Sequence, residues 1–209
     1  MLVLGINTVA DACEAALVRD GVVVAGISEP MQQGHDARLA PVVERLMRES
    51  ATSFPMLDRI AVVVGPGSFT GVRVGVAFAR GLALSLDKPA VGVTSLEALD
   101  GLPQGARVLG LLPAKRRPPE QTWWVQTIDG GRGAGEAGEA DETGVRALAT
   151  RAGAVCGQFS ALADLGVPGI EASPTARAAA LFAARLTHDL PPPRPVYVRE
   201  PDAKPMRAP

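Results

Sequence analysis

Residues 65–84 read Gly65-Pro-Gly-Ser-Phe-Thr-Gly-Val-Arg-Val-Gly-Val-Ala-Phe-Ala-Arg-Gly-Leu-Ala-Leu84 and follow an apolar run at 60–64. The run is typical of a buried strand, and the stretch itself passes from a Gly/Pro turn into an apolar helix pattern. Small residues recur at every fourth position of that helix, which places them on one face. Glycine inside a helix costs about 0.5–1 kcal/mol relative to alanine. We therefore expect another element to pack very close to this inner stripe, which consists of Gly71, Gly75, Ala79 and Ala83.

The segments before this unit predict three strands and a helix. Apolar runs at 2–6, 13–18 and 22–27 have the length and alternation of strands, and Asp20-Gly21 is a strong hairpin signal between the last two. An amphipathic helix is predicted at 37–50, because its apolar residues follow helical spacing. These residues are Leu39, Val42, Val43, Leu46 and Met47.

A short strand at 91–93 and a short helix at 96–99 follow the striped helix, which is predicted at 69–86. The resulting order, β-β-β-α-β-α-β-α, is the layout of actin-like ATPase and ribonuclease-H-like folds. This is an analogy of topology, which does not by itself settle function.

The composition and the pattern of predicted elements change after a domain boundary, which we place near residues 100–105. Strands are predicted at 108–112 and 122–128 around a proline-broken basic joint. The Gly- and acid-rich segment 130–142 is expected to be a flexible loop. Further along the chain, a helix at 175–186, a last short strand at 196–198 and an unstructured tail from 201 are expected.

Composition limits the classes of protein that fit. The chain has 209 residues, of which 47% are hydrophobic and 21% charged, with a net charge of -1. It can therefore build a core, and it lacks the basic footprint of a protein that binds nucleic acid tightly on its own. The two cysteines, Cys13 and Cys156, form no CxxC pattern and fit a reducing compartment. We expect a cytoplasmic protein with no leader and no apolar span long enough to cross a membrane.

The loop before the striped helix is a candidate phosphate cradle, because backbone N–H groups at a helix start bind anions. The spacing of its glycines matches neither of the two common phosphate-binding motifs, the dinucleotide-binding fingerprint and the P-loop. A dinucleotide fingerprint that starts at Gly65 needs glycine where Thr70 stands, and no Gly-Lys-Ser/Thr triplet follows. We favour a structural role in a tight strand-to-helix turn for the whole loop: Gly65, Gly67, Ser68, Thr70 and Gly71.

The end of the first strand is where actin-like phosphotransferases and ribonuclease-H-like nucleases place an aspartate. Here that position is Asn7, and a neutral amide does not supply the charge that a hard divalent cation needs. Asp11 lies close in sequence but reads as a turn residue. No catalytic residue, metal ligand or cofactor-binding residue is therefore assigned.

Other polar residues leave alternatives open. His35 has no evident partner and fits a helix entry or an interface better than a base or a metal ligand. Arg73 and Arg80 lie seven residues apart on one helix face, where they can meet phosphate, acids of a partner or only solvent. The basic run 115–117 beside the tryptophans at 123–124 is a weak candidate for RNA contact.

At this point the sequence resembles a known family. The glycine-loop stretch closely resembles the signature of the bacterial TsaB (YeaZ) family, a member of the Gcp-like, actin-like superfamily. Shorter matches follow in order at 4–8 with Cys13, at His35 with Leu39 and Pro41, at 91–96 and at 195–199. The resemblance implies an α/β fold of the actin-like ATPase (ribonuclease-H-like) type, with two related subdomains of mixed sheets flanked by helices and the second one shortened. We divide the chain into 1–102, 103–190 and a terminal segment 191–209.

The resemblance also implies a function. TsaB proteins are regarded as non-catalytic partners in the synthesis of N6-threonylcarbamoyladenosine beside the anticodon of tRNA. They pair with the paralogue TsaD, which transfers the threonylcarbamoyl group, and the ATPase TsaE joins that pair. The implied cofactors, a metal and a nucleotide, belong to TsaD and TsaE, while tRNA is reached through the complex. An isolated chain is expected to be able to form a homodimer through the inner stripe, in place of the partner.

The implied pairing uses helices of the first subdomain, and the inner stripe suits close contact between helices. On this interpretation Gly75→Leu prevents pairing without unfolding the chain. The rival interpretations are a stand-alone actin-like phosphotransferase or ATPase, and a homodimeric protease or regulator. The predicted interface residues are His35, Leu39, Val42, Leu46, Val72, Arg73, Gly75, Val76, Ala79 and Ala83.

Overall fold

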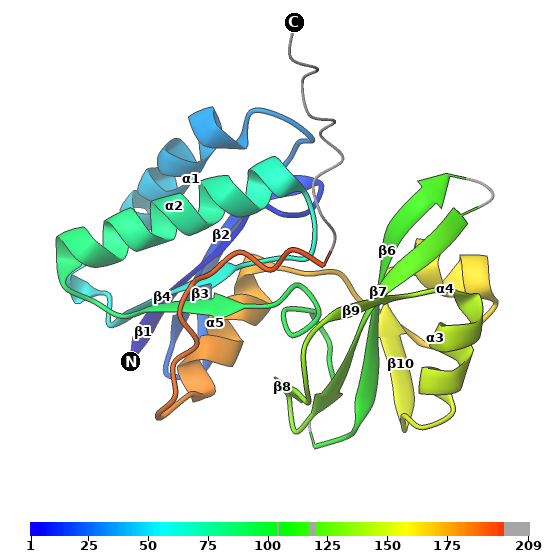
Figure 1. Cartoon of the computed structure of the whole chain (residues 1–209). Helices are drawn as coiled ribbons and strands as arrows, with labels where there is room; N and C mark the ends of the chain where they lie inside the picture. Colours follow the sequence, from blue (N-terminus) through cyan, green and yellow to red (C-terminus); the bar gives the residue numbers. More distant parts are fainter. Residues whose placement is uncertain (104, 118–119, 199–209) are drawn as a thin grey trace, which may run out of the picture.

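Two mixed β-sheets, each with helices against it, make up the chain in the computed structural model, which describes residues 1–103, 105–117 and 120–198 (Figure 1). Three parts of the sequence analysis lie outside the described residues: the tail from 201, Arg199 of the last matching motif, and the prolines at 118–119 of the basic joint.

The first sheet has the strand order β3-β2-β1-β4-β5. Its first three strands form the predicted antiparallel meander, and β4 and β5 continue the sheet in parallel with β1. All residues of β1 and β4 are buried, because helices cover both faces at the centre of the sheet. The strands are β1 Leu2–Asn7, β2 Ala12–Arg19, β3 Val22–Pro30, β4 Arg59–Val63 and β5 Ala90–Val93.

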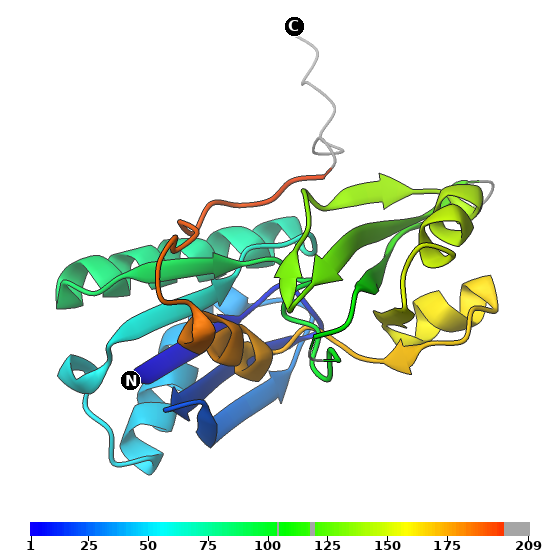
Figure 2. The same cartoon turned by 90° about the horizontal axis from the view of Figure 1, so that it is seen from below.

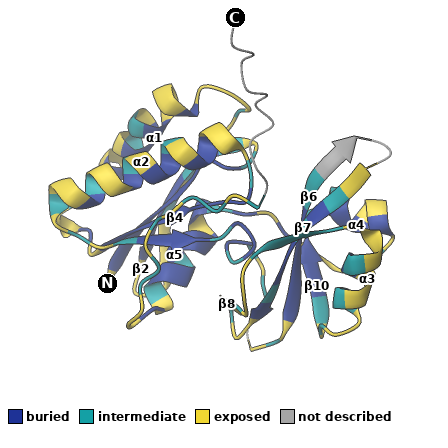
Figure 3. Cartoon of the chain, viewed as in Figure 1, coloured by how far each residue is buried: buried dark blue, intermediate teal, exposed yellow. Residues whose placement is uncertain are grey.

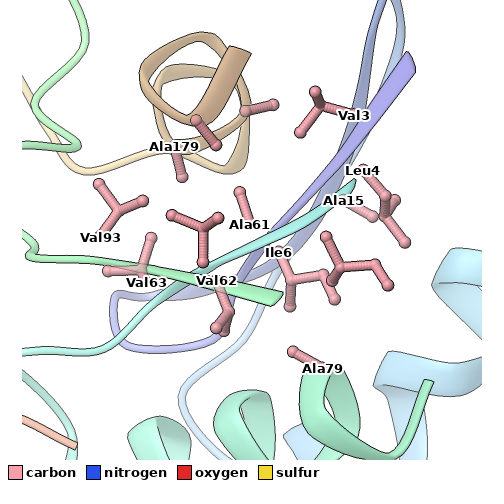
Figure 4. Close-up of a cluster of buried hydrophobic side chains, with 14 of the residues drawn as sticks. Val3, Leu4, Ile6, Ala15, Ala61, Val62, Val63, Ala79, Val93 and Ala179 are labelled. Carbon is pink, nitrogen blue, oxygen red and sulfur yellow. The ribbon is translucent and has the colours of Figure 1, made fainter. Parts of the chain in front are cut away.

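Helices α1 (His35–Glu49) and α2 (Phe69–Leu86) cover one face of this sheet, and α5 (Ala176–Arg185) covers the other. A single 3₁₀ turn at Phe54–Met56 leads from α1 into β4. Figure 4 shows the result at the centre of the sheet, where Ala79 of α2 and Ala179 of α5 point at the strands from opposite sides. The small side chains allow both helices to lie close to the sheet, so the core is thin and dense here.

The second sheet repeats the plan of the first. Its order is β11-β10-β6-β7-β8, with β6 and β7 antiparallel and β10 and β11 parallel to β6, and β9 pairs with the free part of β7. The sheet is covered by α3 (Glu142–Ala149) and α4 (Phe159–Leu165), which are much shorter than α1 and α2. The predicted actin-like fold with two related sheets and a shortened second unit is therefore confirmed. The strands are β6 Val108–Arg117, β7 Glu120–Asp129, β8 Arg132–Gly133, β9 Gly138–Ala140, β10 Ala154–Gly157 and β11 Ile170–Glu171.

Helix α5 corrects one part of the predicted division. Residues 176–185 fall inside the range 103–190 that we assigned to the second unit, yet α5 packs on β1, β2 and β4 of the first sheet (Figure 2). The contact is intimate, since a Cβ at Gly5 would stand only 2.0 Å from the carbonyl oxygen of Ala176. Chain order alone did not reveal this return to the first sheet.

Three local predictions are also corrected. Residues 96–98 form a turn rather than a helix, held by a hydrogen bond from Glu97 N to Thr94 Oγ1, and Leu99 forms a β-bridge with Pro174. The expected loop 130–142 contains β8 and β9. Residues 196–198 form no strand, although Val196 N donates to Val64 O at 2.8 Å.

Both cysteines are free and buried, and burial raises the pKa of each thiol to about 11; for Cys13 the charge of Glu29 adds to the effect. Because the thiolate is the reactive form, we expect both thiols to react with a disulfide reagent at neutral pH at least about 100-fold more slowly in the folded chain than in urea. Stopped-flow thiol titration measures this. A fast phase from the native chain would contradict the burial of that cysteine.

By length and composition alone, α2 is apolar enough to cross a membrane, although Arg73 and Arg80 interrupt its apolar sequence. One such helix is weak evidence, because a core helix of a soluble protein passes the same test. Here α2 carries Arg73 and Arg80 and packs on β4 and β5, which accounts for its apolar composition.

Candidate partner interface

The glycine loop builds a tight turn from β4 into α2. Gly65 has φ +96°, a conformation that suits glycine, and a Cβ at Gly67 would stand 2.8 Å from the carbonyl oxygen of Val9. Ser68 is the N-cap, since its Oγ accepts a hydrogen bond from Gly71 N at 3.2 Å. Thr70 is exposed in the first turn of the helix. The loop therefore has clear structural reasons for its glycines.

The inner stripe of α2 faces the chain's own first sheet. A Cβ at Gly71 would stand 1.9 Å from the carbonyl oxygen of Thr8, and one at Gly75 would stand 2.5 Å from Thr8 Oγ1 and 3.3 Å from Val62. Thr8 Oγ1 also donates a hydrogen bond to Gly71 O at 2.7 Å. The element that the stripe was predicted to meet is thus the end of β1 and not a partner protein.

This geometry corrects the predicted interface. All of the proposed residues except Arg73 are buried within the chain, so they are not available to another protein as the fold stands. The expectation that Gly75→Leu spares the fold is wrong for the same reason, because the new side chain would clash with Thr8. The buried residues are His35, Leu39, Val42, Leu46, Val72, Gly75, Val76, Ala79 and Ala83.

The surface that α2 presents to solvent lies on the side of the helix opposite the inner stripe (Figure 3). We call it the outer face of α2. Leu84 is 85% exposed there. Sequence analysis missed Ala77, Gly81 and Leu84, although the helical spacing of positions 73, 77, 80 and 84 marks a second stripe. The outer face consists of Phe69, Arg73, Ala77, Arg80, Gly81 and Leu84.

The strap, residues 190–198, runs along β5 towards the start of α2 (Figures 1 and 2). Gly92 N donates to Pro191 O at 2.8 Å near its beginning. Near its end, the ring of Tyr197 lies 5.2 Å from that of Phe69, and Arg73 Nε donates to Tyr197 Oη at 3.1 Å. The guanidinium carbon of Arg73 stands 3.8 Å from the centre of the Phe69 ring.

The end of β1 does not fit a magnesium nucleotide. Asn7 is fully buried; its Nδ2 donates to Glu14 Oε2 and to Pro174 O, and its Oδ1 accepts from Val9 N. Glu14 also accepts from Ala176 N, so its carboxylate is engaged in joining β2 to α5. Among the described residues, no group of three or more His, Cys, Asp or Glu side chains gathers as a metal site.

The pocket between the two sheets is small for a nucleotide. Its volume is about 260 Å³, and Asp11 is the one carboxylate in a lining that otherwise includes Ser68, Gln158 and Trp124. Typical sites for drug-sized ligands begin at about 300 Å³.

The tryptophans do not form an RNA-stacking surface. Trp123 is 2% exposed in the core of the second sheet, and Trp124 lines the pocket between the sheets. The side chains of 115–117 lie outside the described part of the structure. Nor do the two histidines form a protease site with other residues in the described part of the chain: His35 is buried at the start of α1, whereas His188 is exposed beside Asp189.

Comparisons with known proteins agree with the fold. The structure of YeaZ from Pseudomonas aeruginosa is 26% identical with a TM-score of 0.70, over 94% of this chain and 99% of that one. The ROK hexokinase of Thermus thermophilus shares the fold alone, at 14% identity and a TM-score of 0.54, over 88% of this chain and 97% of that one.

Sequence relatives point the same way. An Escherichia coli protein named tRNA threonylcarbamoyladenosine biosynthesis protein TsaB is 36% identical over 60% of this chain, a match that spans about half (54%) of the relative's length. An uncharacterised protein of Mycobacterium tuberculosis is 34% identical over 98% of this chain and 94% of its own length. The family model described as TsaD, tRNA N6-adenosine threonylcarbamoyltransferase, matches residues 27–193. The chain thus belongs to the TsaB (YeaZ) family, within the wider group that the TsaD model describes.

Proposed function

We propose that this chain is a non-catalytic partner subunit in the synthesis of N6-threonylcarbamoyladenosine on tRNA. It pairs with a TsaD-type threonylcarbamoyltransferase and activates it, and a TsaE-type ATPase joins the pair. The tRNA, the metal and the nucleotide are handled by the complex and not by this chain alone. The proposed setting is the cytoplasm.

The outer face of α2 is the observation that carries the proposal. It combines a leucine that is 85% exposed with the small residues Ala77 and Gly81, which allow a second helix to approach closely. Phe69, 37% exposed, begins the same face. The family resemblance implies pairing through helices of the first subdomain, and this is the accessible side of the longest one described.

The way that α2 is held supports an activating role. Its inner stripe is locked against Thr8 and Val62, so the outer face is rigid before a partner arrives. A rigid surface loses little conformational entropy on binding. Docking of this surface on the corresponding helices of TsaD favours whichever TsaD conformation fits it, and we propose that this is the catalytically competent one. The engaged state of Asn7 and Glu14 supports the non-catalytic part of the proposal.

We expect Ala77→Trp to weaken the affinity for TsaD at least about 100-fold, because an indole at the centre of the outer face keeps the helices apart. The matched control is Ala147→Trp, at an exposed alanine of α3. Calorimetric titration with TsaD from the same organism measures both, with circular dichroism to confirm folding. Equal affinity of the two variants would contradict the proposed surface.

The same pair of variants tests activation. Formation of threonylcarbamoyladenosine by TsaD and TsaE should rise on addition of the wild-type chain and of Ala147→Trp, but not of Ala77→Trp at the same concentration. Recovery of the rate at a high concentration of Ala77→Trp would show that only binding was lost. A rise in the rate of threonylcarbamoyladenosine formation with a variant that does not bind TsaD would contradict the proposed subunit role.

A further inference from the structure

The chain passes between the two sheets twice, and the two crossing segments are paired with each other. The first segment, 94–100, follows β5, and the second, 172–175, returns from β11 to α5. An antiparallel bridge joins Leu99 to Pro174, and a backbone hydrogen bond of 3.0 Å flanks this bridge on each side. We call the two segments the hinge. Because they form one short ladder, neither can change its backbone angles without disturbing the other.

Glu97 ties the hinge to the second sheet. One oxygen of its carboxylate, Oε2, accepts a hydrogen bond from Thr94 N at 3.0 Å, at the point where the chain leaves β5. The other oxygen, Oε1, accepts from Gly133 N of β8 at 2.9 Å. Hydrogen bonds to a charged acceptor are about twice as strong as those between neutral groups. A single carboxylate therefore holds a strand of the second sheet against the end of the first.

A buried amide makes a second connection at the same place. Gln126 of β7 is 5% exposed; its Oε1 accepts from Thr94 Oγ1 at 2.8 Å, and its Nε2 donates to Gly135 O at 2.9 Å. A Cβ at Gly133 would stand 2.1 Å from Gln126 Nε2, so the glycine allows the amide to lie against β8. Burying an amide without its partners is costly. A rotation that separates Thr94 from Gln126 is therefore opposed.

The return segment is held to the first sheet. Asn7 at the end of β1 donates to Pro174 O at 2.9 Å, and this bond is buried. Asp100 of the hinge pairs through both carboxylate oxygens with Arg177 of α5, whose Nε donates to Oδ2 at 2.8 Å. Below these polar contacts, two leucines of the hinge join an apolar cluster with residues of the second sheet and of the return segment. The cluster consists of Leu96, Leu99, Val108, Leu112, Ile128, Cys156 and Ala172.

These contacts bear on the pocket between the sheets, because its lining comes from both. Ser68 lines it from the first sheet's side, and Trp124 and Gln158 line it from the second. Domains joined by ordinary linkers are expected to move relative to one another, and closure around a ligand uses a few linker residues that absorb the change in backbone angles. In this chain the residues in that place are hydrogen-bonded to both sheets. The angle between the sheets, and with it the pocket volume of about 260 Å³, is thereby constrained.

We propose that Glu97 and Gln126 form a latch that holds the two sheets at one relative angle, so that this chain does not open and close around the pocket between them. Both are positioning residues, since they act on the angle between the sheets and not on a ligand. All of the contacts lie within one chain, so the latch is closed whether or not TsaD is bound.

Distance measurements between two nitroxide spin labels on the full chain test the latch. The labels are placed at Arg48→Cys on α1 and Ala163→Cys on α4, two exposed positions that report the separation of the sheets, while the buried native cysteines react slowly. We expect one narrow distance distribution when the hinge is unsubstituted. Glu97→Ala should widen it at least about twofold, because the second sheet then loses its hydrogen bond to the hinge.

The matched control is Glu142→Ala, because the ion pair of Glu142 with Arg146 lies within α3. This variant should leave the distribution unchanged. Circular dichroism confirms that each variant is folded. If Glu97→Ala does not fold, Thr94→Val provides the same readout with a smaller widening, since it removes only the hydroxyl group from which Gln126 accepts.

Two results would overturn the latch directly. One is a broad or two-peaked distribution with the unsubstituted hinge, and the other is an equal width in Glu97→Ala and Glu142→Ala. Millimolar magnesium-ATP is the probe for closure around the pocket. We expect it to leave the distribution of the unsubstituted hinge in place, whereas a shift of the peak would show that the sheets do close on a nucleotide.

Discussion

Gly71→Ala is expected to lower the free energy of unfolding by about 3 kcal/mol or more, which is the upper range for forcing one methyl group into a packed core. The new Cβ would stand 1.9 Å from the carbonyl oxygen of Thr8, and a backbone atom cannot swing away as a flexible side chain can. The helix would have to move off β1. That movement also breaks the hydrogen bond from Thr8 Oγ1 to Gly71 O.

The control for this prediction is the same substitution ten residues, or nearly three turns, further along the same helix. Gly81 is exposed on the outer face, and a Cβ there meets nothing within 4 Å. Gly81→Ala should therefore raise the free energy of unfolding by about 0.5–1 kcal/mol through helix propensity. Urea denaturation followed by circular dichroism measures both variants. Shifts of the same sign would show that the inner stripe is not as tightly packed as the structure requires.

The contrast between these glycines also bears on how pairing should be tested. Gly75→Leu places a side chain against Thr8 Oγ1, so lost pairing in that variant reports a damaged fold. Substitutions on the outer face, such as Ala77→Trp, change the surface while they leave the contact with β1 intact. Pairing experiments on the inner stripe alone would not distinguish a partner surface from a structural one.

Local patterns predicted most of the first sheet correctly. Alternation and the Asp20-Gly21 turn gave the meander, and helical spacing gave α1 with Leu39, Val42 and Leu46 buried. These features depend on neighbours in sequence, so they are visible without the fold. The stripe on α2 was also found correctly, and the prediction that something packs very close to it holds.

What the stripe packs against was wrong, and the reason is physical. A row of small residues on a helix predicts that another element packs close to it. The row does not indicate whether that element belongs to the same chain, as Thr8 does, or is a helix of another protein. Helix α5 was misplaced for a similar reason, because its return to the first sheet depends on contacts across more than 150 residues. Trp123 was considered for RNA contact because exposure cannot be read from composition alone.

Arg59→Ala is expected to lower the free energy of unfolding by about 1–3 kcal/mol, because it leaves the buried carbonyl of Leu186 without its donor, whereas Ala183 O keeps the hydrogen bond from Leu186 N. Arg59 begins β4 and is 9% exposed, and its guanidinium donates to Ala183 O and to Leu186 O, the latter at 2.9 Å. Burial lowers the pKa of this guanidinium, an effect that the charge of Asp58 partly offsets. These carbonyls end α5, where the helix dipole also favours a cation.

The loss of stability in Arg59→Ala should be greatest in α5, because Arg59 hydrogen-bonds β4 to this helix, which comes from a distant part of the sequence. Hydrogen exchange should show the protection of 178–185 falling more than that of α1. Arg48→Ala, at an exposed arginine of α1, is the control and should leave both unchanged. Since α5 covers the face of the sheet opposite α2, its loosening should leave the outer face of α2 in place. Affinity for TsaD at low temperature should therefore survive Arg59→Ala, whereas a loss of affinity as large as that of Ala77→Trp would show that the two faces of the sheet are coupled.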